Sequence, residues 1–555
     1  MVTWPTNAPG VYSYGVVRRY GTICKVDKFY VNNSRFTSRL FNKAGDLKIT
    51  QPTVNGVDMR YRTHYGWAFA HNGIIYDERA HNLKLACRRN FGCRNPVDNT
   101  DPEVAREYEN RLRANQELFI SRHVNTLERL VDTINYTPPH YDKVEDAIGI
   151  AALPHPKKRL RVDALIDIDN HGLFGHTWSN SVWWKLKLDE YAKPDKYPRV
   201  IVDLGVTASL EGALWISKVK SSISNKWIEH NGWGFVFCGD PNPDIVLEYL
   251  DTIWHNKKSL NGYVLAFSDD AVIGCYVDGK WRVYNLDIST CDASHTPALF
   301  FLMCRILRFP QILIDALWKQ ITALIRVNVK LGQPVFVNTQ NFYLQSGSII
   351  TTLINTIAQL LLFVAFSSNI INEEKDILSI AELAGYVVTC DECLIYEDMQ
   401  FLKMSPTQDV YGVYHACLNL GVIFRASGTC RGDVPRSHIK RRDIERDAAI
   451  FQHKLMTGML TRLRHEHIEK LSPYPIVRDA QSLALAQRDV NALRYMTSGF
   501  APLYGDEIYR RYRLDPSEIA ELHAMLNEVG FGNVTYSTAV SKILKKDYGL
   551  AVPLA

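Results

Sequence analysis

The sequence predicts an α+β fold in which short strands are preceded and followed by helices. The strand signal is concentrated in residues 263–292, where three apolar runs alternate with polar turn residues. The runs are Tyr263–Phe267, Ala271–Val277 and Trp281–Leu286. Helical periodicity is found before this stretch at 102–135 and after it from Pro297 onward. Strands that adjoin in sequence, together with separate helices, are typical of the α+β class.

Length and composition indicate a folded protein with several domains or subdomains. Its 555 residues exceed the size at which a single core stops growing. Hydrophobic residues make up 46% of the chain and charged residues 22%, which excludes the disordered class. The net charge of +5 permits a polyanionic partner without requiring one. Eleven scattered cysteines and a start that lacks a basic and apolar leader predict reduced thiols and no signal peptide.

Two features precede the strand region. Residues 102–135 carry apolar residues at helical spacing and charge pairs four positions apart, which predicts one long helix. A basic segment runs from Lys185 to Arg199 and leads into the apolar strand Val200–Leu204. It suits a polyanionic substrate, because a triphosphate needs positive charge for binding and for its leaving group. An exposed hairpin whose lysines keep a sheet edge soluble is the alternative.

The turns between the three apolar runs bring carboxylates together. Asp278-Gly279 is the strongest short hairpin signal, because both turn residues need positive φ. With these two residues as the loop, Asp270 lies directly opposite Asp287. Opposed like charges are destabilising and oxygen-only ligands suit Mg²⁺ or Mn²⁺, so this pair with the adjacent Asp269 predicts a metal site. Two solvated acidic turns are the alternative, since Asp favours turns.

The most apolar segment is Ser348–Phe366, which is about as long as a membrane span requires. Polar residues recur in its N-terminal half, mostly at helical spacing, namely Thr351, Thr352, Asn355, Thr356 and Gln359. We therefore expect a core helix with one polar working face and no transmembrane span. The remaining patterns predict helices at Pro297–Phe309, at Pro310–Val329 and through most of the chain beyond 410, and a short strand at Met399–Met404.

Several motifs with independent spacings occur together between residues 185 and 405. Asp287-Ile-Ser-Thr-Cys-Asp292 has two aspartates separated by four residues, and Ser346-Gly347-Ser-Ile-Ile-Thr351-Thr-Leu-Ile-Asn355 follows it. These match the first and second palm motifs of viral RNA-dependent RNA polymerases, and Ser268-Asp269-Asp270 resembles the third, usually Gly-Asp-Asp. The segments 185–199, 385–393 and 401–403 resemble the basic fingertip motif and the two later palm motifs.

The order of the motifs is permuted, because the Asp-Asp hairpin precedes the first palm motif instead of following the Ser-Gly helix. This order resembles that of birnavirus and permutotetravirus polymerases. The resemblance implies a right-hand polymerase fold with fingers, a palm built on an antiparallel sheet, and a helical thumb. Its expected divisions are an N-terminal extension with part of the fingers at 1–150, fingers at 151–255, palm at 256–304, a fingers insertion at 305–345, palm at 346–409 and thumb at 410–555.

The resemblance implies an RNA-directed RNA polymerase that transfers nucleotides from NTPs to an RNA 3′ end in viral genome replication and transcription. Two Mg²⁺ ions, for which Mn²⁺ is an alternative, would be its cofactors. Asp287 and Asp269 would be the principal metal ligands, and Asp270 would support them. RNA template, nascent RNA and NTPs would be the partners, with viral capsid or other replication proteins beside them. The implied location is the host cytoplasm, with packaging in the virion as a further option.

A second group of palm residues would select the nucleotide. Asp292, about where the first motif passes into a helix, would meet Asn355 and read the ribose 2′-hydroxyl, which argues for ribonucleotides. Ser346 and Gly347 would form the flexible turn that admits template and nucleotide. Thr351 lies one helical turn before Asn355 and shares its face.

Cations outside the palm complete the implied site. Triphosphate binding would fall to Arg199, Lys196, Lys193, Lys187 and Lys185, and Arg199 would also stack on the base. Support of the primer strand would fall to Phe401, Leu402 and Lys403. Two departures from the family pattern stand out: Ser268 replaces the usual glycine, and Asp391, Glu392 and Cys393 stand where a lysine often protonates pyrophosphate. A general acid is therefore not assigned.

Two other classes of function remain as alternatives. A reverse transcriptase or DNA-making polymerase would use the same palm, although the pairing of Asp292 with Asn355 argues against it. A replication factor without catalytic activity would bind RNA through basic clusters such as Lys440-Arg441-Arg442. It would bind a membrane through the apolar helix. Incorporation of rNTPs and dNTPs on an RNA template distinguishes all three classes.

Overall fold

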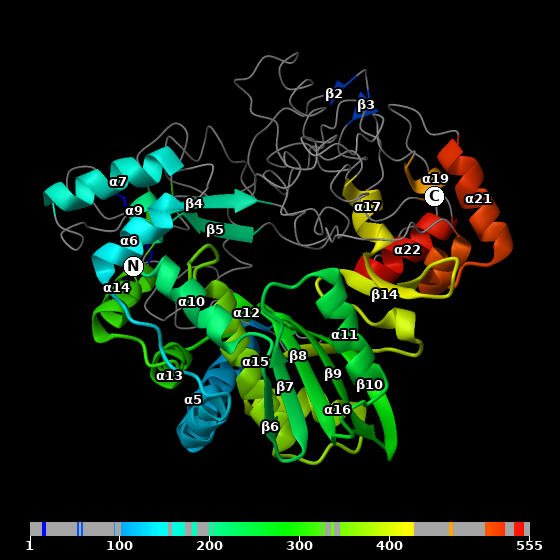
Figure 1. The fold of residues 1–555 in the computed structure, drawn as a ribbon, viewed down its shortest axis with the longest axis horizontal. Coiled ribbons are helices and arrows are strands. Elements are labelled where there is room, and N and C mark those ends of the chain that lie inside the picture. The colour runs from blue at the N-terminus through cyan, green and yellow to red at the C-terminus, as the bar shows by residue number, and fades with distance from the viewer. Residues whose placement is uncertain are drawn as a thin grey trace.

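The computed structural model describes most of the chain between residues 101 and 426 and parts of both ends. The described residues are 101–153, 158–171, 205–322 and 344–426, with shorter segments at 14–17, 53–54, 57–58, 94, 180–185, 199–203, 325–327, 335–337, 465–469, 505–527 and 538–548. Helices and mainly antiparallel sheets occur together in these segments (Figure 1), so the predicted α+β class is confirmed.

A six-stranded sheet forms the centre of the described structure, in the order β13-β10-β9-β8-β7-β6. All of its strand pairs are antiparallel except β7 with β8. The strands are β6 (Trp227–His230), β7 (Trp233–Phe237), β8 (Gly262–Phe267), β9 (Asp270–Val277), β10 (Lys280–Ile288) and β13 (Val388–Glu392). The sheet therefore begins earlier than the predicted palm, because β6 and β7 fall in the range expected for the fingers.

Local turn chemistry sets the register of the three central strands. Asp278 and Gly279 join β9 to β10 with φ values of 51° and 70°, as a two-residue hairpin loop requires. Asp270 consequently pairs with Asp287, and this predicted register is confirmed. The turn between β8 and β9 is equally short and contains Ser268, whose φ is 57°.

Both faces of the central sheet are buried. On β9, Ile273 faces one core and its neighbour Val272 faces the other, as the alternation of side chains along a strand dictates. The first face packs on α15 (Thr351–Ser367), α5 (Pro102–Thr133), α13 (Pro297–Ile306) and α16 (Glu374–Leu383). The second face packs on α11 (Pro243–Trp254). Figure 1 shows α15 and α11 on opposite sides of the strands.

Helix α15 is a core element, as its pattern predicted. Every residue from Leu353 to Ser367 is buried, because the helix lies between the sheet and the helices α5, α13 and α16. None of the described helices has the length and apolarity needed to cross a bilayer. The predicted helix at 102–135 is also confirmed as α5, which begins with Asp101 as N-cap and Pro102 in the first turn.

A second sheet and several helices lie at one side of the palm. The sheet has the order β1-β12-β11-β4-β5. Its strands are β1 (Tyr14–Val17), β4 (Asn180–Lys185), β5 (Arg199–Asp203), β11 (Ile325–Val327) and β12 (Val335–Val337). The helices nearby are α6 (Lys143–Ala152), α7 (Lys158–His171), α9 (Gly205–Leu210), α10 (Ala213–Ile223) and α14 (Gln311–Thr322). A separate hairpin joins β2 (Thr53–Val54) to β3 (Val57–Asp58).

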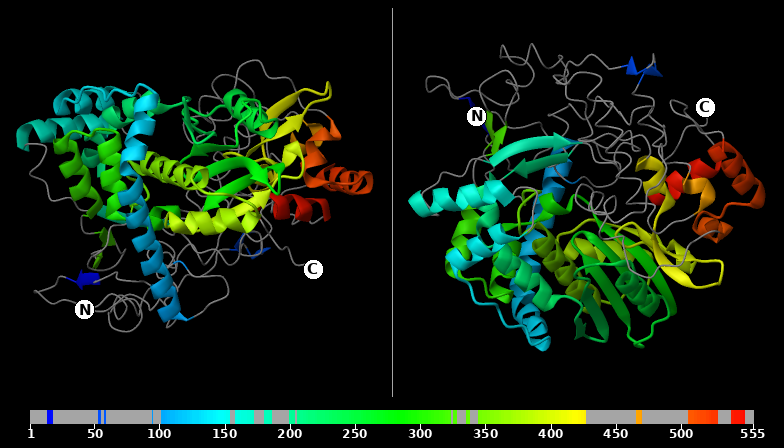
Figure 2. Two further views of the ribbon diagram at one scale, coloured as in Figure 1. Left: turned by 90° about the horizontal axis from the view of Figure 1, so that it is seen from below. Right: turned by 45° about the horizontal axis from the view of Figure 1, so that its top comes forward.

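The C-terminal elements gather at the other side (Figures 1 and 2). A hairpin of β14 (Met404–Gln408) and β15 (Tyr414–Leu418) connects them to the palm. The C-terminal elements are α17 (Leu420–Ala426), α19 (Glu466–Glu469), η4 (Asp506–Tyr512), α21 (Pro516–Asn527) and α22 (Thr538–Tyr548). Two short elements precede them: the helix α12 (Cys291–Ser294) after β10, and the turn η2 (Tyr396–Asp398) after β13.

Three local predictions are wrong in part. The helix expected at Pro310–Val329 ends as α14 at Thr322, and β11 follows. The segment Met399–Met404 is a tight turn and not a strand, because Leu402 and Lys403 have φ values of 54° and 62°. The chain beyond 410 contains the strand β15 before its helices.

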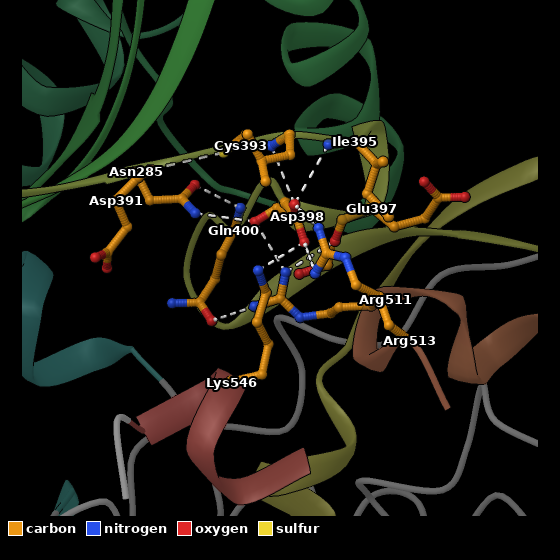
Figure 3. Close-up of polar contacts among 12 residues, drawn as sticks. Asn285, Asp391, Cys393, Ile395, Glu397, Asp398, Gln400, Arg511, Arg513 and Lys546 are labelled. Atoms are coloured by element: carbon orange, nitrogen blue, oxygen red, sulfur yellow. Dashed lines mark hydrogen bonds and ion pairs between the residues drawn. The ribbon is translucent and has the colours of Figure 1, made fainter. Parts of the chain in front are cut away.

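A buried ion cluster joins the C-terminal elements to the palm (Figure 3). The carboxylate of Asp398 is 1% exposed and pairs with Arg513 at 2.7 Å and Lys546 at 2.6 Å. Arg511 donates to the carbonyl oxygen of Asp398 at 2.9 Å. From the palm side, Asn285 on β10 donates to the same carbonyl oxygen at 2.9 Å. The strand that carries Asp287 is therefore linked to η4 through one acidic residue.

Candidate active site

Three aspartates lie at one end of the β8–β9–β10 meander. Asp270 begins β9 directly opposite Asp287 on β10, and Asp269 occupies the turn just before it. Burial raises the pKa of the Cys291 thiol well above its usual value, and the charges of Asp269, Asp292 and Asp287 raise it further. The carboxylates of Asp269, Asp287 and Asp292 therefore all lie near this buried thiol. Side chains at directly paired strand positions have Cβ atoms roughly 4.5–5.5 Å apart, which is close enough to share a cation.

The donor set fits a hard divalent cation. Asp269 and Asp270 are half-buried and Asp287 is exposed, so a ligand can reach the group from solvent. Carboxylate oxygens are the preferred ligands of Mg²⁺ and Mn²⁺, and both Asp270 and Asp287 sit on strands of the sheet. A cation would also offset the repulsion between the paired carboxylates, which would otherwise destabilise the hairpin.

The polar face of α15 holds the Ser268–Asp269 turn in place. The hydroxyl of Thr356 accepts from the backbone N–H of Ser268 at 3.2 Å, and Gln359 donates to the carbonyl oxygen of Asp269 at 3.1 Å. Asn355 donates to the hydroxyl of Ser268 at 3.2 Å. Three residues of one helix thus contact two successive turn residues. The replacement of glycine by Ser268 adds a link to α15 at the cost of a positive φ in a residue with a Cβ.

Asp292, Ser346 and Asn355 form a second polar group beside the turn. The amide of Asn355 donates to one oxygen of the Asp292 carboxylate at 3.1 Å, and the Ser346 hydroxyl donates to the other oxygen. The predicted meeting of Asp292 with Asn355 is therefore present. Asp292 lies on α12, immediately after β10, and its carbonyl oxygen accepts from the backbone N–H of Leu344.

His295 is a site residue that the sequence reasoning missed. Its Nε2 lies 2.7 Å from Oδ1 of Asn355, and its Nδ1 lies 3.3 Å from the hydroxyl of Tyr386. Burial lowers the pKa of His295 to about 4, so the imidazole is neutral at physiological pH. Its partners assign the proton to Nε2, which donates to Asn355 while Tyr386 donates to Nδ1. The spacing of three residues from Asp292 is the signal that could have indicated this position.

The loop before α15 approaches the fingers closely at Gly347. The carbonyl oxygen of Ser346 accepts from the backbone N–H of Val202 on β5 at 2.9 Å. Gly347 has a φ of 112°, and a Cβ there would lie 2.4 Å from the carbonyl oxygen of Val202. Only glycine combines this φ with this approach. The hydroxyl of Thr351, at the start of the helix, is buried and has no hydrogen-bond partner within the part of the chain that the structure describes.

The structure places only part of the basic segment. Arg199 begins β5 and pairs in register with Lys185, the last residue of β4. Lys187, Lys193 and Lys196 lie outside the described residues. Since β5 is hydrogen-bonded to the Ser346 loop, Arg199 sits on the same strand that contacts the second palm motif.

The three residues expected to support the primer have different environments. Phe401 is 1% exposed and packs in the core beneath α11, so it anchors the turn at Leu402 and Lys403 to that core. Leu402 and Lys403 form the tip of the turn and are half-buried. The carbonyl oxygen of Lys403 accepts from the backbone N–H of Asn419 at 2.9 Å, which anchors the turn to the end of β15.

A polar cavity of about 380 Å³ opens next to the Ser268–Asp269 turn. Phe267 precedes the turn, and Thr352 lies in the first turn of α15; both line this cavity. Lys220 and three serines of the α10 segment line the opposite side. The remaining lining residues are Phe237, Gly239, Asp240, Pro241 and Asn242. Its mouth combines a cation with hydroxyl groups, which are common contacts of a sugar–phosphate backbone.

Two solved structures with low sequence identity are similar to this chain. Among solved structures, the X-ray structure of a birnavirus VP1–VP3 complex is 11% identical with a TM-score of 0.38, covering 74% of this chain and 63% of that chain. The RNA polymerase VP1 from infectious pancreatic necrosis virus is 11% identical with a TM-score of 0.37, covering 78% of this chain and 64% of that one. The chain therefore spans a little under two thirds of the length of these structures. No curated protein sequence matches it.

A family model described as viral RNA-dependent RNA polymerase matches residues 276–424. The matched segment contains the first and second palm motifs, from Asp287 to Asn355, and continues through β14 and β15. The Ser268–Asp270 turn lies just before it, in agreement with the permuted order of the motifs. This match agrees with the resemblance to viral RNA-dependent RNA polymerases that the sequence motifs predicted. Residues 276–424 are similar to the viral RNA-dependent RNA polymerase family.

Proposed function

We propose that this chain synthesises RNA on an RNA template, in replication and transcription of a viral genome. The observation that carries the proposal is the juxtaposition of the Asp270–Asp287 pair with the Asp292–Asn355 pair at one end of the sheet. One pair suits divalent cations, and the other suits a ribose hydroxyl. A nucleotidyltransferase that uses ribonucleotides needs both sites next to each other.

The aspartates of the meander act as metal ligands in this proposal. Asp287 and Asp269 hold two Mg²⁺ ions, for which Mn²⁺ can substitute, and Asp270 supports them. When bound, such ions activate the primer 3′-hydroxyl and stabilise the departing pyrophosphate. Thr356 and Gln359 keep the backbone of the turn in place, so that the carboxylate of Asp269 stays aimed at the site.

The second polar group selects the sugar. Asp292 accepts from Asn355 and Ser346 in the described structure, so its carboxylate is oriented before a nucleotide arrives. A ribose 2′-hydroxyl can donate to Asp292 and accept from Asn355, because a hydroxyl has both capacities. The unpartnered hydroxyl of Thr351, one turn earlier on α15, adds a further group for the nucleotide. Gly347 lets this loop lie against β5, which also brings Arg199 toward the site.

Positive charge at the fingers binds the triphosphate in this proposal. Lys185 and Arg199 occupy paired positions of β4 and β5. Lys187, Lys193 and Lys196 extend the cationic segment between them in the sequence. Arg199 is suited to bidentate phosphate contact and to stacking on the base.

The RNA strands and the domain assignment complete the proposal. The cavity beside Phe267 and Thr352 takes a strand backbone, with Lys220 as its cation, and Leu402 with Lys403 supports the primer from the palm edge. We assign fingers, palm and thumb to the ranges predicted from the motifs, with β6 and β7 added to the palm sheet. Capsid or other replication proteins are further partners, and the host cytoplasm, with packaging in the virion, is the location.

Primer extension on an RNA template tests the proposal. The variants Asp269→Asn and Asp287→Asn should lose more than about 100-fold in rate, because each removes a charged metal ligand while keeping its shape. Asp278→Asn is the matched control, since it lies in the turn at the other end of the same hairpin and Asn tolerates its φ of 51°. It should extend primers like the wild type.

Two outcomes would reject the assignment. Elongation at the wild-type rate by both metal-ligand variants would remove the catalytic role of the meander. RNA binding without any Mg²⁺-dependent incorporation by the wild-type chain would indicate a binding protein without catalytic activity. Parallel reactions with dNTPs distinguish the DNA-making alternative, which requires incorporation of dNTPs to exceed that of rNTPs.

A further inference from the structure

Three side chains with metal-binding atoms meet in the C-terminal region, away from the proposed catalytic site. His465 precedes α19, Asp506 begins η4, and His523 lies on α21. Their ligand atoms all lie within 4.8 Å of one another. We propose that His465, Asp506 and His523 form a binding site for one Zn²⁺ ion. It is independent of the proposed polymerase function.

Both histidine–aspartate distances are within a few tenths of an ångström of those in a bound site. Nε2 of His523 lies 3.6 Å from Oδ1 of Asp506, and Nε2 of His465 lies 3.9 Å from the same oxygen. Ligand atoms about 2.0–2.1 Å from a tetrahedral Zn²⁺ are roughly 3.3 Å apart. Closing by a few tenths of an ångström is within reach of Asp506, whose side chain is 58% exposed and begins η4.

The chemistry of the three ligands selects Zn²⁺ over the cations of the catalytic site. Two imidazoles and one carboxylate are a common zinc set, whereas Mg²⁺ prefers oxygen ligands alone. Three protein ligands leave the fourth position to water, and the exposure of Asp506 opens that side to solvent. His465 is 2% exposed, so one ligand is held rigidly by its surroundings.

The groups around the cluster define what binding must displace. The Tyr509 hydroxyl lies 3.2 Å from Nε2 of His523, so an ion at that nitrogen replaces this hydrogen bond. His467 stacks on His523 with ring centroids 4.0 Å apart, but its Nδ1 lies 3.3 Å from Oδ1 of Asn527. We therefore count His467 as a packing neighbour and not as a ligand.

Zinc at this position would tie together three segments that are distant in sequence. Figure 1 shows α19 and α21 side by side, and the ion would add η4 to this pair. Asp506 opens η4, and Arg511 near its other end donates to the palm at Glu397 and Asp398 (Figure 3). A bound ion would thus fix the first residue of η4, the element whose Arg511 contacts Glu397 and Asp398.

Titration of the full chain, without a histidine tag, with Co²⁺ tests the proposal. Excess Mg²⁺ is kept present so that oxygen-only sites are filled. We expect one equivalent of Co²⁺ to give a strong visible absorption band, which tetrahedral nitrogen ligation produces and octahedral oxygen ligation does not, and Zn²⁺ to abolish it by competition. Affinity should fall below about pH 6, because imidazoles bind in their neutral form.

Variants identify the ligands. Asp506→Asn and His523→Gln should weaken metal binding by more than about 100-fold. Replacing a residue that only hydrogen-bonds to a metal ligand already lowers metal affinity by about 10- to 100-fold. Tyr509→Phe should bind at least as tightly as the wild type, because it removes the competing hydroxyl. His255→Gln is the matched control, since His255 also pairs with a carboxylate, Asp251, at 2.9 Å but has no second imidazole beside it among the described residues. Asp269→Asn, in the proposed catalytic site, should also bind normally.

Three results would overturn the proposal. The first is a wild-type chain that takes up no Co²⁺ or Zn²⁺ at micromolar concentration. The second is equal binding by Asp506→Asn, His523→Gln and the wild type, and the third is an equal loss in His255→Gln. Circular dichroism of each variant excludes unfolding as the cause, and the two ligand variants carry partly exposed side chains so that folding is preserved.

Discussion

The imidazole of His295 donates a hydrogen bond of 2.7 Å to Oδ1 of Asn355, and this contact fixes the direction of the Asn355 amide. With Oδ1 occupied, the NH₂ group faces Asp292 and Ser268, to which it donates at 3.1 Å and 3.2 Å. One buried histidine thereby orients the residue that joins Asp292 to the Ser268–Asp269 turn. In the proposed function His295 is a positioning residue, because it would act on the nucleotide through Asn355.

Replacement of His295 by Ala should impair sugar selection more than catalysis. Asn355 would lose the donor that holds its orientation, a contact worth about 1–1.5 kcal/mol or roughly tenfold in a rate ratio. We expect the ratio of kcat/KM for ATP over dATP to fall by about tenfold, and His295→Gln, which retains an N–H donor, to restore part of it. An unchanged ratio with uniformly lower rates would assign His295 a purely structural role.

The burial of neutral His295 also predicts a pH dependence of stability. Its pKa is about 4 in the folded chain and about 6.5 when unfolded, so the unfolded state binds more protons between these values. The stabilisation is complete above pH 6.5 and is lost as pH falls toward 4, by an amount on the order of 3 kcal/mol. Thermal melts at pH 7 and pH 4.5 should show a smaller difference for His295→Gln than for the wild type.

Two substitutions at Ser268 separate backbone strain from hydrogen bonding. Ser268→Gly removes the Cβ from a position with a φ of 57° but loses the bond from Asn355, so the two effects offset each other. Ser268→Ala keeps the strain and loses the bond, and should destabilise by about 1 kcal/mol. We expect elongation by the Gly variant within about threefold of the wild type and slower elongation by the Ala variant. Equal stability and equal elongation rates of the Gly and Ala variants would contradict this separation of backbone strain from hydrogen bonding.

Gly347→Ala should disrupt nucleotide entry without unfolding the chain. The new Cβ would meet the Val202 carbonyl oxygen at 2.4 Å, so the loop must move away from β5. We expect a rise in KM for NTPs of at least about tenfold. Gly279→Ala is the matched control, since it has a positive φ of 70° but no atom within 4 Å of the added carbon. Its KM should stay near that of the wild type, and a similar rise in both variants would point to backbone strain alone.

Removal of the charge on Asp398 should loosen the C-terminal elements. The Arg513 and Lys546 side chains hold the pKa of Asp398 below its usual value against the effect of burial, so the carboxylate is charged at neutral pH. Asp398→Asn would leave two cations with a neutral partner, at a cost of about 3–5 kcal/mol. Hydrogen exchange should increase in η4 and α22 of this variant while β8 and β9 stay protected. Uniform exchange across all four elements would indicate global destabilisation.

Features set by neighbouring residues were predictable from the sequence, and features set by distant contacts were not. The pairing of Asp270 with Asp287 followed from two turn residues, and the polar face of α15 followed from helical spacing. The partners of that face were not predictable, because Thr356 and Gln359 bind backbone groups of a turn some 90 positions earlier in the chain. His295 was missed for the same reason, since its role depends on Asn355, 60 positions away.

The errors in the fold have the same physical origin. The strands β6 and β7 joined the palm sheet through a parallel pairing of β7 with β8, which leaves no turn signal in the sequence. The segment Met399–Met404 has the apolar content of a strand, but Leu402 and Lys403 adopt positive φ to close a turn against Asn419. Tertiary contacts there override the local preference of both residues.

The position of Asp270 and Asp287 in a single hairpin has a consequence for how the protein folds. Two paired strands closed by a two-residue loop have low contact order, and such hairpins form in about 1–10 μs. The paired carboxylates can therefore meet before α15 is made by the ribosome, because α15 lies downstream of the hairpin. Moving the Asp-Asp turn ahead of the first palm motif turns a contact between distant segments into an early, local step of synthesis.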